Sequence, residues 1–404
     1  MKLRNLESIN LQGKTILYRA PYDIELREVA GVLEVSDDMR IKFTLPTLKY
    51  LLKENCKIII LTYVGRPDGK VVEELRTTPH ARRLAELLGY PVQKVDDCIG
   101  ADVEKKISEM HPGEILMLEN VRFHSEEMVD DDEFSRQLCK GKDFVVFDGF
   151  PQAHRMHAST TGIERHLPSV AGLYLKQEVE MLSTLLDNPK HPFTVIIGGA
   201  KISDKVDAVN NLLRRADTIL VGGAVSNVFL KSEGREISES FIEDVFVDKM
   251  RREKKDWVLY AGDITKRAQS LGKKIIFPQD LIVSDGVSIK TVDIASEGVP
   301  AGWKALDIGP KTQKNFSDII SQSQTVFING PMGKFEDEKF VEGSKSVLEA
   351  MKNVKGETII AGGDTIDLAR KYGNLDNYTH ISLAGGATLE FLAGKELPAL
   401  KALQ

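Results

Sequence analysis

Four short apolar runs in the second half of the chain each stand directly before a pair of glycines, or one residue before it. The runs and their glycine pairs are Thr194–Ile197 with Gly198–Gly199, Thr218–Val221 with Gly222–Gly223, Thr358–Ala361 with Gly362–Gly363, and His380–Leu383 with Gly385–Gly386. Each run predicts a buried strand that turns through glycine into a helix. Glycine has no Cβ, so backbone N–H groups can approach a ligand closely, and the start of a helix favours phosphate. Because such turns gather at the carboxyl ends of parallel strands, the repetition favours a nucleotide site over tight packing alone.

Strand-like and helix-like segments alternate through the whole chain, which predicts an α/β fold with parallel sheets. The strand candidates of the first half are Thr15–Tyr18, Lys57–Thr62, Ile115–Leu118 and Phe144–Phe147. A chain of 404 residues is long for a single core. We therefore expect two Rossmann-like, three-layer lobes with parallel sheets, joined by a hinge helix.

The hinge is expected as a connector helix at residues 173–189. Leu175, Val179 and Leu182 recur at helical spacing, and Pro189 ends the pattern. An ordinary core helix of one domain is the alternative. A connector is favoured because arginine-bearing turns precede it and glycine-pair turns follow it. The expected lobes are residues 1–172 and 190–379.

Composition, charge and the absence of long apolar stretches argue against several classes of function. The net charge of −6 argues against general nucleic-acid binding. No apolar stretch approaches the length of a membrane span, and residues 1–5 lack the apolar core of a signal peptide. Cys56, Cys98 and Cys139 show neither metal-ligand spacing nor a disulfide framework, so we expect a protein of the reducing cytoplasm.

Four arginines stand beside predicted strand ends or a predicted helix start. They are Arg40, which opens a helix, and Arg66, Arg122 and Arg155, which come just after strands. Because the ends of parallel strands share one edge of a sheet, the four can converge on one face. Guanidinium groups bind phosphate and carboxylate through paired hydrogen bonds, so a cluster predicts a small polyanionic ligand. Taken one at a time, each arginine is more typical of an ordinary surface position.

The glycine turns of the second half carry further polar residues. Lys201 and Lys205 follow the first glycine pair and are expected on one helical face. Asp364 and Thr365 follow the third pair, where the carboxylate suits Mg²⁺ bound to nucleotide phosphates. The alternative is that one of these two residues only caps the helix. The lysine segment is not a Walker A loop, and no dinucleotide fingerprint follows the strands, which argues against a dehydrogenase.

An anion-binding half and a nucleotide-binding half suit phosphoryl transfer between two lobes that close across a hinge. Blocks that support this interpretation are Asp37–Ile41, Gly65–Pro67, Leu118–Phe123, Ala153–Arg155, Gly198–Lys205, Leu306–Pro310, Asn329–Gly333, Gly362–Thr365 and Gly394–Pro398. In number and order they resemble the phosphoglycerate kinase family, over essentially the whole chain. The resemblance implies a glycolytic phosphotransferase that moves a phosphoryl group between ATP and the carboxylate of 3-phosphoglycerate.

The resemblance also implies how the first lobe handles the acid. Arg66, Arg122 and Arg155 would hold the substrate phosphate, and Arg40 would stabilise the transferring phosphoryl group. In the family the last segment packs on the first lobe, so residues 380–404 are expected to return there. We expect a cytoplasmic monomer with small-molecule substrates and with neither nucleic-acid nor membrane partners.

For the second lobe, the resemblance implies Mg-ATP or Mg-ADP as ligand. Lys201 and Lys205 would take part in catalysis, and Asp364 would be the Mg²⁺ ligand. Lys205 and Asp364 would also contact the nucleotide. The other implied nucleotide contacts are Gly199, Gly222, Gly223, Leu306, Asn329, Glu336, Gly362, Gly363 and Thr365.

The departures from the family pattern cluster on the substrate side. Pro21 stands where the family has a substrate-binding aspartate, Asp23 where it has asparagine, and Tyr63 where it has histidine. Asp23 would repel the substrate carboxylate, and Pro21 offers the substrate hydroxyl no acceptor. We therefore expect altered affinity or specificity for 3-phosphoglycerate. A kinase for another phosphorylated carboxylate and a nucleotide-binding regulator without catalysis stay open as alternatives.

Overall fold

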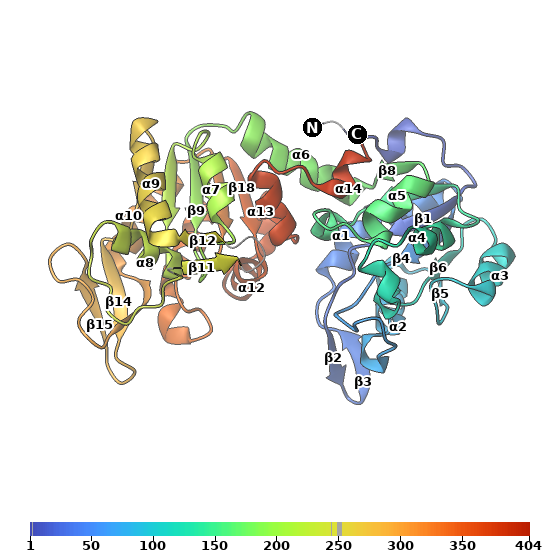
Figure 1. Cartoon of the computed structure of the whole chain (residues 1–404), viewed down its shortest axis with the longest axis horizontal. Helices are drawn as coiled ribbons and strands as arrows, with labels where there is room; N and C mark the ends of the chain where they lie inside the picture. Colours follow the sequence, from blue (N-terminus) through green and yellow to red (C-terminus); the bar gives the residue numbers. More distant parts are fainter. Residues whose placement is uncertain (2, 244, 249–252) are drawn as a thin grey trace. The chain divides into compact units, whose positions relative to one another are not determined.

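The computed structural model describes residues 1, 3–243, 245–248 and 253–404, which form two compact units (Figure 1). Unit 1 comprises Met1–Glu180 and Glu396–Gln404, and unit 2 comprises Met181–Lys395. Each unit is built on a six-stranded sheet of parallel strands, which confirms the predicted α/β class. None of the described helices combines the length and the apolar character needed to cross a membrane.

The sheet of unit 1 has the strand order β5–β6–β4–β1–β7–β8, and its pairings are all parallel. Its strands are β1 (Thr15–Arg19), β4 (Lys57–Leu61), β5 (Val92–Lys94), β6 (Ile115–Met117), β7 (Phe144–Phe147) and β8 (Ser169–Ala171). β1 and β4 are buried almost throughout, because both faces of a parallel sheet are covered. This burial explains why their sequences are continuous apolar runs, and the strands expected in this half are all present.

The helices of unit 1 lie on both faces of its sheet. They are α1 (Met39–Lys53), α2 (Thr78–Leu88), α3 (Ala101–Glu109), α4 (Asp132–Cys139) and α5 (Ile163–His166), with a hairpin of β2 (Leu26–Val29) and β3 (Val32–Val35) before α1. The chain runs from β1 outward to β5 and then reverses toward β8. Right-handed crossovers therefore place α1 and α2 on one face and α3 to α5 on the other. The core includes Ile16, Tyr18, Leu48, Leu51, Ile58 and Ile60.

The sheet of unit 2 repeats this plan with the order β13–β10–β9–β17–β18–β19, again with parallel pairings. Its strands are β9 (Phe193–Ile197), β10 (Thr218–Val221), β13 (Lys274–Ile276), β17 (Thr325–Asn329), β18 (Glu357–Ala361) and β19 (His380–Ser382). The four runs before glycine pairs are β9, β10, β18 and β19, as predicted. Strand order reverses between β9 and β17, which is where such sheets bind ligands.

The helices of unit 2 follow the same crossover rule. They are α7 (Val206–Leu212), α8 (Gly223–Ser232), α9 (Trp257–Ser270), α10 (Pro310–Ser321), α11 (Glu342–Lys352), α12 (Gly363–Tyr372) and α13 (Gly386–Leu392). α8 packs against α9, and α10 packs against α11. Unit 2 also contains two small antiparallel sheets. The first has three strands, β14 (Asp280–Ser284), β15 (Ile289–Asp293) and β16 (Lys304–Ile308), and the second is the hairpin of β11 (Val245–Asp248) and β12 (Glu253–Asp256).

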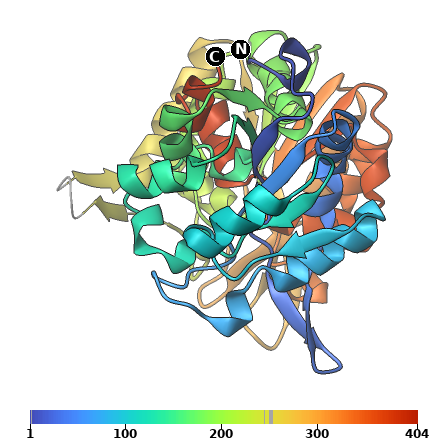
Figure 2. The ribbon, with the colours of Figure 1, turned by 90° about the vertical axis from the view of Figure 1, so that its right-hand side faces the viewer.

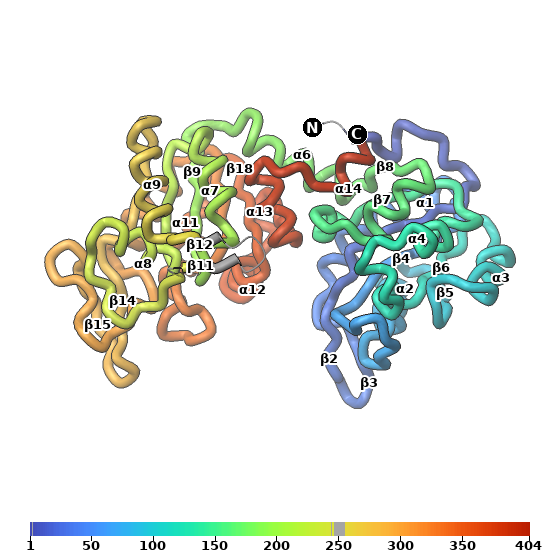
Figure 3. The backbone as a smooth tube through the Cα atoms, in the orientation of Figure 1, coloured from blue at the N-terminus to red at the C-terminus, as the bar shows by residue number. Residues whose placement is uncertain are grey.

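The chain passes between the units at two places. α6 (Leu173–Asp187) begins in unit 1 and ends in unit 2, with the division between Glu180 and Met181, and Figure 3 lets the reader follow its backbone. The returning segment is shorter than expected and starts at Glu396, because β19 pairs with β18 and α13 contacts α7 within unit 2. This segment carries α14 (Pro398–Lys401). The Arg4 N–H donates to the Leu403 carbonyl oxygen at 2.8 Å, so the two ends of the chain lie together in unit 1 (Figure 2).

Candidate functional site

A cavity of about 470 Å³ opens in unit 2 beside the carboxyl ends of β9, β17 and β18. This position is the reversal point of the strand order, where open parallel sheets bind ligands. The turns after these strands and the helices α7, α12 and α13 form its walls. The lining residues that the sequence singled out are Gly199, Lys205, Asn329, Gly362, Gly363, Asp364 and Thr365.

Glycine is required where the turns of unit 2 press on one another. The Gly199 N–H donates to the Pro331 carbonyl oxygen at 2.7 Å, and the Gly223 N–H donates to the Met332 carbonyl oxygen at 2.9 Å. A Cβ at Gly198 would lie only 2.1 Å from the Pro331 oxygen. Three loops therefore meet backbone against backbone at the edge of the cavity, a contact that any side chain would separate.

A second cavity of about 230 Å³ adjoins the first and shares Gly199, Pro331 and Asp364 with it. Its lining is largely apolar and includes Gly223, Ala224, Leu281, Ala305, Leu306 and Met332, with the exposed Glu336 at its border. Gly222 stands behind this slot, since a Cβ there would lie 2.4 Å from the Met332 sulfur. The polar first cavity thus continues into an apolar slot.

Lys205 brings a positive charge to the first cavity. Its side chain is buried, and its Nζ donates to the Lys201 carbonyl oxygen at 3.3 Å. Burial lowers the pKa of Lys205, while the nearby carboxylates of Asp204 and Asp364 act in the opposite direction. Lys201 itself is exposed.

The prediction that Lys201 and Lys205 share a helical face is wrong, because α7 begins only at Val206. The segment before it forms a turn. Ser203 donates from its N–H and its hydroxyl to the Glu243 carboxylate, at 2.9 and 2.6 Å. These bonds to a distant segment hold the residues between the lysines out of the helix.

Asp364 brings a carboxylate to the same cavity from the first turn of α12. Partial burial raises its pKa, and the nearby carboxylates of Glu336 and Asp367 raise it further, whereas Lys205 lowers it. A carboxylate among like charges gains from a bound cation. The residue at the helix N-cap is Gly362, and Asp364 and Thr365 make no side-chain cap. Thr365 instead accepts a hydrogen bond from the Gly330 N–H at 2.8 Å through Oγ1.

In unit 1, two of the predicted substrate residues, Arg122 and Arg155, contact Tyr63, which follows β4 and is almost fully buried. The Arg122 guanidinium lies 3.5 Å from the centre of the tyrosine ring. Arg155 Nη1 and Gln152 Nε2 donate to the tyrosine hydroxyl at 3.3 and 3.2 Å. Residues from the turns after β4, β6 and β7 therefore meet at one edge of the sheet, as the sequence predicts for Arg122 and Arg155.

Asp23 forms hydrogen bonds with two other parts of the predicted substrate site. Its Oδ1 accepts the Gly65 N–H at 3.0 Å, which fixes the turn that precedes Arg66. Arg40 Nη1 donates to the Asp23 backbone oxygen. Asp23 thus links Arg40 to the Arg66 turn, whereas the Arg66 side chain itself points into solvent and is exposed.

Arg19 is a member of this cluster that the sequence analysis missed. It ends β1 with only 1% of its surface exposed, and its guanidinium lies 5.4 Å from the centre of the Tyr63 ring. Its Nε donates to the Ser159 carbonyl oxygen at 3.0 Å. The Ser159 N–H and hydroxyl donate in turn to the buried Glu127 carboxylate at 2.8 and 2.7 Å. The signal available was the one that found the other arginines, a cationic residue at the end of a buried strand.

Two α/β units, one with arginines at its strand ends and one with a glycine-walled cavity, define the class of two-lobed kinases. The model of the family described as "Phosphoglycerate kinase" matches residues 6–395. The phosphoglycerate kinase of Moorella thermoacetica is 42% identical over 98% of both chains. That of Pelotomaculum thermopropionicum is 38% identical over 100% of this chain and 99% of its own. This chain therefore belongs to the phosphoglycerate kinase family, and it is a phosphotransferase with a carboxyl group as acceptor.

Solved structures of the family agree with the fold. The phosphoglycerate kinase of Coxiella burnetii matches with a TM-score of 0.85 at 32% identity, over 100% of this chain and 99% of that one. The enzyme of Pyrococcus horikoshii matches with a TM-score of 0.84 at 34% identity, over 100% and 98%. The likeness thus extends through both units.

Proposed function

We propose that the protein transfers a phosphoryl group between ATP and the carboxylate of 3-phosphoglycerate, with altered affinity or specificity for the acid. The observation that carries this proposal is the pair of adjoining cavities in unit 2. A polar space bordered by a lysine and a carboxylate continues into an apolar slot. A nucleoside triphosphate has the same two parts, a charged phosphate chain and a flat apolar base.

In this proposal the slot beside Leu306 takes the base, and Glu336 at its border takes the ribose hydroxyls. The glycine turns, with Lys201 and Lys205, face the phosphates, because backbone N–H groups and ammonium groups both stabilise them. Asp364 would hold Mg²⁺, since its carboxylate lines the cavity among other carboxylates. Such an ion, when bound, neutralises charge on the phosphate oxygens.

The arginine cluster of unit 1 takes the phosphorylated acid. Arg66, Arg122 and Arg155 bind its phosphate, for which guanidinium groups offer paired donors. Arg40 stabilises the phosphoryl group in transfer, where positive charge lowers the barrier.

Altered acid binding is supported by what surrounds Tyr63. Its ring covers one face of Arg122, and its hydroxyl accepts a donor of Arg155, so both arginines are partly engaged before any ligand arrives. The Asp23 backbone oxygen accepts from Arg40 Nη1, and the Asp23 carboxylate accepts the Gly65 N–H, so a negative charge stands at the turn before Arg66. The same observations favour a kinase for a different phosphorylated carboxylate as the second candidate.

A coupled assay with Mg-ATP, 3-phosphoglycerate and a panel of other phosphorylated carboxylic acids tests the proposal. We expect turnover of 3-phosphoglycerate, with a KM for this acid above the KM of a variant that carries the family residues at positions 21, 23 and 63. Asp364→Ala should lower kcat/KM roughly a hundredfold, because it removes the carboxylate proposed to hold Mg²⁺ beside the nucleotide phosphates. Asp318→Ala is the matched control, since this exposed carboxylate on α10 pairs only with Lys314 among the described contacts.

The outcomes separate the candidates. Turnover restricted to another acid would make the protein a kinase for that acid. ATP binding without turnover of any acid would overturn the proposal in favour of a nucleotide-binding regulator.

A further inference from the structure

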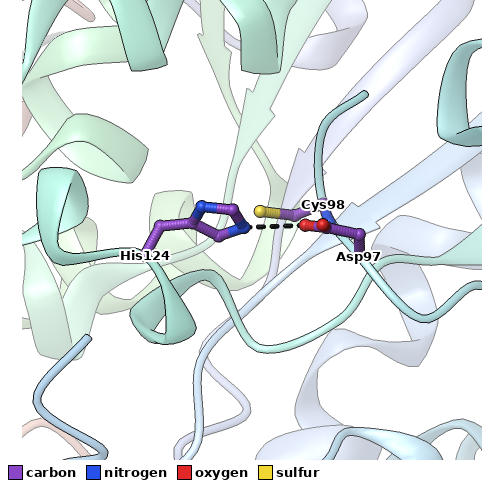
Figure 4. Close-up of side chains that lie close together, drawn as sticks. All are labelled: Asp97, Cys98 and His124. Atoms are coloured by element: carbon purple, nitrogen blue, oxygen red, sulfur yellow. Dashed lines mark hydrogen bonds and ion pairs between the residues drawn. The ribbon is translucent and has the colours of Figure 1, made fainter. Parts of the chain in front are cut away.

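Asp97, Cys98 and His124 form a cluster in unit 1 that the proposed function does not use (Figure 4). Their ligand atoms all lie within 4.8 Å of one another. Asp97 and Cys98 lie in the loop between β5 and α3, and His124 directly follows the short helix η3 (Val121–Phe123). The sequence spacing of the cysteines gave no sign of this cluster, because its histidine comes from a separate loop.

The backbone holds the two loops together. The Glu119 N–H donates to the Asp97 carbonyl oxygen at 3.2 Å, and His124 Nε2 lies 2.7 Å from Asp97 Oδ1. The imidazole ring packs against the ring of Phe134 on α4, with 5.0 Å between their centres. The Cys98 N–H also donates to Asp97 Oδ1 at 2.6 Å, so contacts that do not depend on a bound ion position all three residues.

The donor set is a thiol, an imidazole and a carboxylate, which are the ligands that Zn²⁺ takes in proteins. Bond lengths of about 2.0–2.3 Å place ligand atoms of a tetrahedral site roughly 3–4 Å apart. The pair at 2.7 Å needs to open by only about an ångström or less to admit the ion. Cys98 is buried, while the side chains of Asp97 and His124 are 52% and 26% exposed, so one side of the cluster is open to solvent.

We propose that Asp97, Cys98 and His124 bind Zn²⁺ as a three-ligand site of unit 1, with solvent as the fourth ligand. The ion replaces the thiol proton, which leaves to solvent, and the imidazole binds in its neutral form. This site differs from the oxygen-rich one expected at Asp364, because sulfur and nitrogen select a softer metal than Mg²⁺.

The charges around the thiol act in both directions. Burial and the carboxylates of Asp97 and Glu127 raise the pKa of Cys98, whereas Lys142 lowers it.

Titration of the whole protein with Co²⁺ as a spectroscopic probe tests the site. We expect Co²⁺ to give a thiolate-to-cobalt charge-transfer band in the near ultraviolet. One equivalent of Zn²⁺ should displace the Co²⁺ and remove this band. Cys98→Ser should abolish the band, and His124→Gln should weaken binding at least tenfold. Cys139→Ser is the matched control, because this thiol is also buried in unit 1 but lies outside the cluster. Circular dichroism verifies that each variant is folded.

Two results would overturn the proposal. The first is the absence of a charge-transfer band in the parent protein, which would mean that the Asp97–His124 contact serves only to tie two loops. The second is a band that persists in Cys98→Ser, which would place the bound metal on another thiol. Asp97→Asn, at an exposed side chain, gives a further arm if Cys98→Ser does not fold; it should also weaken Co²⁺ binding.

Discussion

Tyr63 occupies the centre of the arginine cluster, with the Arg122 guanidinium on its ring and the Arg155 donor on its hydroxyl. A cation over an aromatic ring is stabilised by about 0.5–2 kcal/mol. A phosphorylated acid must compete with this contact for the same arginines. A histidine here could carry a positive charge, whereas a tyrosine stays neutral and can offer one hydrogen bond.

Restoring the family residues should therefore strengthen binding of the acid. In the triple variant Pro21→Asp, Asp23→Asn and Tyr63→His, we expect 3-phosphoglycerate to bind at least tenfold more tightly by isothermal titration. A regained charged hydrogen bond contributes roughly 1.5–3 kcal/mol, which matches that factor. Tyr90→His, at an exposed position of unit 1, controls for the substitution itself. Equal affinity in the triple variant and the parent would mean that these residues do not face the ligand.

Because His80 is buried, we predict that the free energy of unfolding of unit 1 depends on pH. His80 is fully buried on α2, where its Nε2 donates to the Ile24 carbonyl oxygen at 3.2 Å. Burial lowers the pKa of His80 to about 4, and the pKa of His157 is lowered to about 4 by burial and nearby arginines. Between about pH 6.5 and 4 the unfolded chain binds protons that the folded chain excludes. The free energy of unfolding therefore falls as the pH falls through this window.

Denaturant unfolding of unit 1, followed from pH 7 to pH 4, measures this effect. We expect each such histidine to contribute about 1.4 kcal/mol per pH unit, so His80→Gln should flatten the dependence. His111→Gln alters a histidine with an 84% exposed side chain and should leave the slope unchanged. An equal slope in His80→Gln and the parent would contradict the prediction.

At the scale of elements, local patterns were enough to predict most strands of the two parallel sheets and the glycine turns. Continuous apolar runs identified β1, β4, β9 and β18, because a strand covered on both faces needs apolar residues throughout. Features that depend on contacts between distant segments were not accessible in this way. Examples are the hydrogen bond from Ser203 to Glu243, the pairing of β19 with β18, and the contact of the Cys98 loop with His124. The antiparallel sheet of β14, β15 and β16 also gave no signal that we recognised.

The packed glycine turns of unit 2 allow a sharp steric test. Gly198→Ala puts a Cβ 2.1 Å from the Pro331 oxygen, so the turn must move. We expect a loss of roughly 1–3 kcal/mol in the stability of unit 2, together with weaker ATP binding. Thermal unfolding and an ATP titration measure the two effects.

The control for this substitution is Gly262→Ala. This glycine lies within α9, where an added Cβ meets nothing nearer than 3.8 Å and alanine suits the helix. The steric account would be wrong if Gly198→Ala matched the parent in both measurements.

At the scale of the whole molecule, unit 1 is made from two parts of the chain. Leu397, Leu400 and Leu403 of the returning segment are buried, and the Ala399 N–H donates to the Ala153 carbonyl oxygen at 3.2 Å. Ala153 precedes the His154–Arg155 pair, so this segment supports the loop of a proposed substrate arginine.

Removing residues 396–404 should weaken unit 1 selectively. Each buried leucine contributes about 1.5–3 kcal/mol, so the loss should be about 5 kcal/mol or more. Hydrogen exchange should accelerate in peptides of residues 1–180, while Mg-ATP binding by unit 2 is retained. Lys401→Ala, at an exposed position of the same segment, serves as the control. Unchanged exchange in unit 1 would show that the segment is dispensable.

The divided composition of unit 1 has a consequence for the order in which the protein matures on the ribosome. The whole of unit 2, residues 181–395, is translated between the two parts of unit 1. At roughly 5–20 residues per second, that interval lasts on the order of 10–40 s. For most of that interval the first 180 residues have left the ribosome without the buried leucines of the returning segment. The unit that is synthesised first is therefore the unit that is completed last.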